Sequence, residues 1–141
     1  MAKLYLIGIL ISIYFLSSMS SCQPGQDIKT AQYAVNGQKI YNTHCKNCHG
    51  DKGEGLGLLY PPLTDADFLA KNRNRLSSIV KNGLDEEIVV MGKTFNSKMP
   101  ANENLTDIDI AYVLTYITTN FAKQKEIFSL EEVQKDLKDR K

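Results

Sequence analysis

Residues that bind metals through nitrogen or sulfur are scarce, because the 141 residues include only two histidines and three cysteines. A structural zinc site usually takes four protein ligands, commonly from two separated pairs. Here both histidines and two of the cysteines fall in one short segment, HCKNCHG, which begins at His44. No cysteine follows Cys48 and no histidine follows His49. The second pair of ligands is therefore missing, and the sequence disfavours zinc.

An excess of charge of either sign is also absent. The chain has 17 basic and 16 acidic residues, which give a formal net charge of +1. Such a balance offers no case for binding nucleic acid or an anionic surface. Apolar residues make up 43% of the chain and charged residues 23%. These fractions are ordinary for a soluble protein of one domain.

No apolar run reaches a comfortable membrane-spanning length. The most apolar segment, LYLIGILISIYFL at residues 4–16, is too short to cross a bilayer easily as a helix. It follows Lys3 and precedes the small residues SSMSSC, a pattern typical of an export signal. We predict a signal peptide over residues 1–21, with an uncleaved anchor as the alternative. Export would place the mature chain in an oxidising compartment, the periplasm or cell envelope.

Cys22 closes this segment. The sequence MSSC resembles the lipobox of bacterial lipoproteins, in which the cysteine is lipidated and becomes the first residue of the mature chain. The following QPGQD looks like a tether, so residues 22–33 are predicted to be a linker. More than one lipid chain would anchor the protein firmly to a membrane. The alternative is an ordinary signal peptide that leaves Cys22 free.

Helical periodicity dominates the rest of the chain. Apolar residues from Tyr33 to Tyr41 share one face of a predicted helix that runs into Cys45. A second helix is expected to end at Gly83. The strongest helix should begin at Thr106, with acidic residues in its first turn.

The remaining segments predict shorter elements. The glycine- and proline-rich sequence GDKGEGLGLLYPPL excludes regular structure after the cysteine motif. Thr64 is expected to cap a short helix over residues 65–70. Residues 88–91 are expected to form a short extended piece. A capping box of Ser129 and Glu132 predicts a last helix.

These elements predict an all-α fold of four to five short helices. The main domain is expected to cover residues 34–122. A charged helical tail should follow over residues 123–141.

The spacing of Cys45, Cys48 and His49 predicts covalent attachment of haem c. Two thiols at this separation can add to the two vinyl groups of one porphyrin edge, and the adjacent histidine then lies under the iron. A dithiol redox centre is the alternative. Such a centre normally sits at the start of a helix in an α/β unit, whereas this motif follows a helix.

Haem iron with a histidine ligand often takes methionine on its other side. Two methionines follow the signal segment, Met91 and Met99. Met99 precedes Pro100 in an irregular segment that can wrap a cofactor, whereas Met91 lies in an apolar VVM run typical of a core or a strand. We therefore favour Met99 as the second ligand. The alternative is that Met99 only fills a gap in the core.

Residues from about 34 to about 121 resemble a bacterial class I (monohaem) cytochrome c. The matching pieces are GQKIYNTHCKNCHG, PPL, IVKNG, FNSKMP and LTDIDIAYVLTYI, in the order typical of the family. The resemblance implies a small all-α fold wrapped around one covalent haem. Cys45 and Cys48 would form the thioethers, and His49 and Met99 would be the axial ligands of the iron.

The resemblance also implies supporting roles. Gly37 and Tyr41 would lie where the N-terminal helix crosses the C-terminal helix, near Val113 and Tyr116. The carbonyl of Pro61 would accept a hydrogen bond from His49 and orient its ring.

Arg75, or Arg73, would hold a haem propionate, with a solvated helix end as the alternative. Phe95 departs from the tyrosine of many relatives, and the tail after Ala122 lies outside the match.

A closed histidine–methionine iron predicts one-electron transfer rather than enzymatic turnover. We expect a membrane-tethered carrier that serves redox partner proteins of a respiratory chain. Lys46, Lys52 and Lys98 would meet an acidic partner, or would simply be solvated. One alternative is a subunit of a larger oxidoreductase complex that docks through the tail. Another is a haem enzyme or gas sensor with a labile distal ligand.

Overall fold

The computed structural model describes residues 24–139. The expected signal peptide over residues 1–21 and the lipidation site Cys22 lie outside the described residues. Among the helices that are described, none combines the length and the hydropathy needed to cross a membrane.

The first described helix, α2 (Pro24–His44), shows that the predicted linker was wrong from Pro24 onwards. Proline suits the first turn of a helix, where its missing N–H would have no intrahelical partner. Most of the residues between Gly25 and Tyr33 tolerate a helix, and the Tyr33 ring packs edge-on against Tyr112 at 4.8 Å between centroids. The helix that was expected to start near Tyr33 therefore begins at Pro24 and includes most of the segment expected to be a tether.

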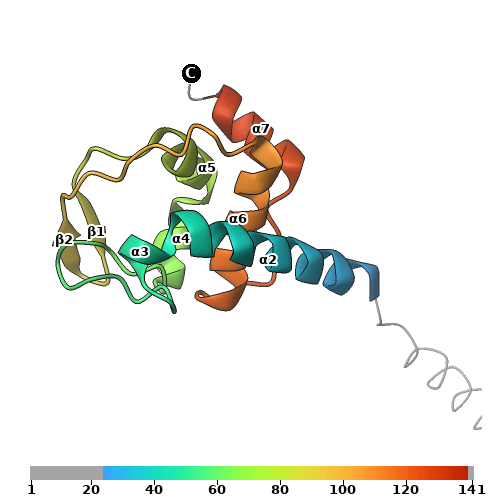
Figure 1. Cartoon of the computed structure of the whole chain (residues 1–141), viewed down its shortest axis with the longest axis horizontal. Coiled ribbons are helices and arrows are strands. Elements are labelled where there is room, and N and C mark those ends of the chain that lie inside the picture. Colours follow the sequence, from blue (N-terminus) through green and yellow to red (C-terminus); the bar gives the residue numbers. More distant parts are fainter. Residues whose placement is uncertain (1–23, 140–141) are drawn as a thin grey trace, which may run out of the picture.

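Helix α2 packs mainly against α6 (Asp107–Asn120), and the two cross in the middle of the molecule (Figure 1). Gly37 lies at the crossing, because a Cβ atom on it would collide with the Tyr112 carbonyl and lie 2.8 Å from the Tyr116 Cβ. Tyr41, one turn further, is fully buried and packs on Tyr116 and Phe121. The crossing implied by the family resemblance is confirmed.

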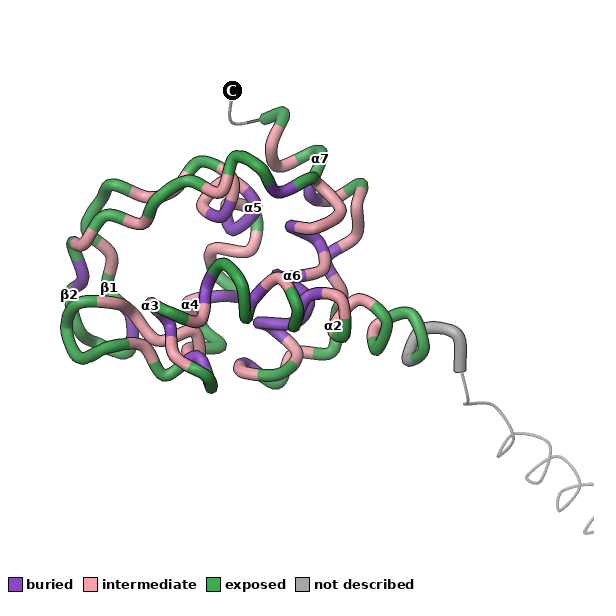
Figure 2. The backbone as a smooth tube through the Cα atoms, in the orientation of Figure 1, coloured by how far each residue is buried: buried purple, intermediate pink, exposed green. Residues whose placement is uncertain are grey.

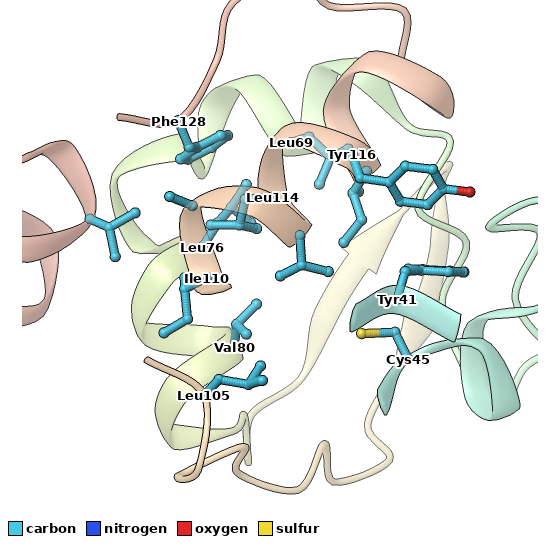
Figure 3. Close-up of a cluster of buried hydrophobic side chains, with 14 of the residues drawn as sticks. Tyr41, Cys45, Leu69, Leu76, Val80, Leu105, Ile110, Leu114, Tyr116 and Phe128 are labelled. Carbon is cyan, nitrogen blue, oxygen red and sulfur yellow. The ribbon is translucent and has the colours of Figure 1, made fainter. Parts of the chain in front are cut away.

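Helix α6 forms the centre of the core (Figure 2). Thr106 caps it, and Asp109 completes a capping box. Its apolar side chains pack between α2, α5 (Arg73–Asn82) and the tail. Figure 3 shows Tyr41 and Cys45 at one side of this cluster and Leu105 at the other.

Two short elements surround the core on the side of the cysteine motif. Helix α4 (Ala66–Lys71) is capped by Asp65 rather than by the expected Thr64, since an Asp65 carboxylate oxygen accepts from the Phe68 N–H. Strands β1 (Ile88–Val90) and β2 (Lys93–Phe95) form an antiparallel hairpin. The sequence predicted only one extended piece there, over residues 88–91.

The tail folds back on the domain. Ser129 caps helix α7 (Leu130–Lys138), because its side chain accepts from the Glu132 N–H as predicted. The predicted capping box is incomplete, since the Glu132 carboxylate is bound by Arg73 instead. Phe128 and Val133 are fully buried in the same core as α6. Arg73 donates to both carboxylate oxygens of Glu132 at 2.7 and 2.9 Å and stacks on the Phe128 ring.

The fold is mainly helical, as predicted. Between residues 24 and 139 the structure contains six helices and one two-stranded sheet, rather than four to five helices alone. The additional helix is α3 (Lys46–His49), a single turn that contains most of the cysteine motif.

Candidate functional site

Helices α2 and α3 place the cysteine motif at the edge of the core. Helix α2 ends at His44, and the Cys45 N–H still donates to the Tyr41 carbonyl at 2.9 Å. The next turn, α3, carries Cys48 and His49. Both cysteines are free thiols; Cys45 is buried and Cys48 half-buried. Cys45 and the turn that follows it therefore bring two sulfur atoms and one imidazole together at the edge of the core.

These three side chains line an apolar cavity of about 140 Å³. Its walls come from the segment after α3 and from α4, α5, the hairpin and α6. The main apolar contributors are Pro61, Pro62, Leu63, Phe68, Leu69, Leu76, Ile79, Val80, Ile88, Val90, Phe95, Leu114 and Ile117. A cavity with such walls suits a large apolar group.

The His49 ring is held in a defined orientation. Its Nδ1 lies 3.0 Å from the Pro61 carbonyl oxygen, and it can only donate there, so Nε2 carries the free lone pair. Burial lowers the pKa of His49 below its usual value, which the bond to Pro61 partly offsets. The neutral imidazole, the form that binds metals, is therefore favoured. This is the contact that the resemblance implied.

The environment of Cys45 favours the protonated thiol. Burial, and secondarily the neighbouring Cys48, raises the pKa of Cys45 to about 11. Nearby, the Tyr41 hydroxyl donates to the Gly50 carbonyl at 2.7 Å and fixes the chain just after His49. Burial raises the pKa of Tyr41 as well, so the hydroxyl keeps its proton. Sequence reasoning assigned Tyr41 only to helix packing and missed this bond.

The structure separates the two candidate methionines. Met99 is half-buried and lines the same cavity as His49, whereas Met91 is 61% exposed at the turn between β1 and β2. Asp65 holds that turn, since its carboxylate accepts from the Met91 N–H at 2.8 Å. Met91 is thus neither a core nor a strand residue, because the hairpin reverses at this point.

Several charged residues have partners within the chain. Arg75 forms an ion pair with Glu86, which lines the cavity, and Arg73 belongs to the tail contact. Lys46 pairs with Asp51 at 2.6 Å. Lys98 pairs with Asp85 at 3.0 Å. Sequence reasoning did not identify Glu86, and no local pattern marks it, because its place beside Arg75 depends on how the chain folds.

Comparison with known proteins gives consistent matches. The family model for cytochrome c matches residues 34–121. A cytochrome c-552 of Thermus thermophilus is 36% identical over 110 residues, which cover 72% of this chain and 83% of that protein. A second cytochrome c-552 from the same species is also 36% identical over 110 residues, covering 74% of its length.

The residues of the cavity fit a covalent haem. Cys45 and Cys48 are free thiols separated by two residues, the Nδ1 of the His49 imidazole is already hydrogen-bonded, and the Met99 thioether lines the same apolar cavity. Imidazole and the methionine thioether are the axial ligands of haem iron in cytochromes c, and two cysteines followed directly by histidine supply the thiols for covalent attachment. The chain therefore belongs to the cytochrome c family, as a class I monohaem cytochrome whose covalent haem c transfers electrons.

Proposed function

We propose that this cytochrome holds its haem iron between His49 and Met99 and works as a lipid-anchored electron carrier in the bacterial envelope. One observation carries the proposed ligation: His49, Met99 and the free thiols of Cys45 and Cys48 line a single apolar cavity. The proposed anchor rests on the sequence MSSC that ends at Cys22. Two axial ligands from the protein would leave the iron no open position for a substrate.

The protein's own residues would make electron transfer easy by keeping the site rigid. The haem supplies the one-electron chemistry when bound. Cys45 and Cys48 would fix the porphyrin edge, and Pro61 holds the His49 ring through Nδ1. Met99 is held by backbone hydrogen bonds to Leu84. A fixed set of ligands in an apolar cavity would change little in geometry between two oxidation states.

Partner docking would depend more on shape and apolar contact than on charge. Lys46 and Lys98 already form ion pairs with Asp51 and Asp85, so their net attraction for an acidic protein is weakened. The loop after the cysteine motif instead exposes three leucines, at 49–68% of their accessible area: Leu56, Leu58 and Leu59. We propose that respiratory redox proteins meet this surface.

The tail is better explained as part of the domain than as a docking element for a larger complex. Its apolar residue Val133 is fully buried, and Ser77 on α5 donates to Asp136 on α7 at 3.2 Å. This arrangement favours the independent carrier over the complex subunit.

The membrane anchor can be tested at Cys22. In Cys22→Ser, chains that have lost the signal peptide should appear in the soluble fraction, because the residue proposed to carry the lipid is gone. Fractionation and mass spectrometry would check the location and the N-terminus. Gln26→Ala is the control and should remain in the membrane fraction with the mass of the lipid. A processed Cys22→Ser protein that stays in the membrane fraction would contradict the anchor.

A further inference from the structure

The segment that carries Met99 is attached to the C-terminal end of helix α5. Leu84 and Met99 exchange two backbone hydrogen bonds, at 2.9 and 3.0 Å. Gly83 permits this approach, because a Cβ atom on it would lie 2.5 Å from the Met99 carbonyl oxygen. After Met99, the Asn102 N–H donates to the last-turn carbonyls of Val80 and Lys81 at 3.3 and 3.2 Å.

Lys81 adds a charged connection to the same segment. Its side chain leaves the last turn of α5, and the Nζ donates to the carbonyl oxygens of Glu103 at 2.9 Å and Leu105 at 2.6 Å. Leu105 is itself buried in the core just before α6 begins. One ammonium group therefore ties the end of α5 to the chain between Met99 and α6.

The connection on the other side of Met99 is weaker. Lys98 pairs with Asp85, but both side chains are 72% exposed. Exposed ion pairs contribute little to stability. Hydrogen bonds from a charged donor contribute more than neutral ones, especially when they are partly buried. The Lys81 bridge is thus the stronger of the two charged contacts beside Met99.

We propose that Lys81 is a positioning residue for Met99, which it keeps at the cavity by bridging the carbonyls of Glu103 and Leu105. This rests on the proposed ligation of the iron by Met99. Without the bridge, the Met99 segment should detach from the cavity more often, while the remaining backbone bonds to Leu84 restore it. The observable consequence is easier access of an external ligand to the iron, with the resting ligation unchanged.

Imidazole binding to the oxidised holoprotein measures this access. Lys81→Met should keep covalent haem and a low-spin spectrum, but bind imidazole about tenfold more tightly than the unaltered protein, because apparent affinity follows the population of the open state. Lys81→Arg retains a cation with several donors and should stay near the unaltered protein. Lys135→Met removes an exposed last-turn lysine of α7 and is the matched control.

The outcomes separate two failures. The absorption band that reports bonding of the methionine sulfur to oxidised iron, here called the sulfur-to-iron band, serves as the check on ligation. If the unaltered protein shows this band and Lys81→Met and Lys135→Met bind imidazole equally, the role of Lys81 alone is overturned. If that band is absent from the unaltered protein, ligation by Met99 fails and the inference fails with it. If Lys81→Met yields little holoprotein, Lys81→Gln keeps the test available, and tighter imidazole binding there would support the bridge.

Discussion

Replacing Met99 with alanine is expected to leave the haem covalently attached while lowering its reduction potential by on the order of 0.1 V. The thioether ligand favours reduced iron, so its loss stabilises the oxidised state. The attachment should survive because Cys45 and Cys48 come from a separate segment, helix α3 and the residue before it. The open iron should also bind carbon monoxide when reduced. Redox titration and absorption spectroscopy measure both effects.

Met91→Ala is the matched control for this experiment. Met91 is exposed at the hairpin turn and does not line the cavity. Its removal should leave the potential and the carbon monoxide response unchanged. A Met99→Ala protein with an unchanged potential would show that Met99 is not a ligand, and a large change in Met91→Ala would reverse the assignment.

The second large effect is expected at the helix crossing. Gly37→Ala should reduce the free energy of unfolding by about 2–3 kcal/mol, because the new methyl group would collide with the Tyr112 carbonyl. Helix propensity alone would predict the opposite change in the free energy of unfolding, because it favours alanine over glycine by about 1 kcal/mol. Denaturant unfolding of the holoprotein measures the change.

Gln38→Ala provides the comparison, since Gln38 is the exposed neighbour of Gly37 on the same helix. Its effect should stay within about 0.5 kcal/mol. A Gly37→Ala protein as stable as the unaltered one would mean that α2 and α6 do not need the close approach seen at Tyr112. The same crossing positions the end of α2, and with it the cysteine motif.

Local signals in the sequence predicted many elements correctly. The capping residues Thr106 and Ser129, the C-terminal Gly83 and the cysteine motif depend on neighbours within a few residues, so their effects can be read from short segments. The contact between His49 and Pro61 followed from the family resemblance rather than from any local rule.

Features that depend on distant contacts were not predicted in the same way. Glycine near Pro24 suggested a tether, but the helix gains stability further along from Tyr33 and Gly37 packing on α6. The sequence pattern of the tail does not show whether the helix docks on a partner or on its own domain. The burial of Val133 and the hydrogen bond from Ser77 to Asp136 show that it packs on its own domain. No local pattern in the sequence marks Lys81, because its two carbonyl partners lie more than twenty residues away.

The most direct test is the absorption spectrum of the mature protein, oxidised and reduced, with and without carbon monoxide. Closed ligation by His49 and Met99 predicts a low-spin c-type spectrum, with a sulfur-to-iron band when oxidised and no change on adding the gas when reduced. A high-spin spectrum, or one that shifts with carbon monoxide, would keep the covalent haem but contradict the methionine ligand and the role of a simple electron carrier.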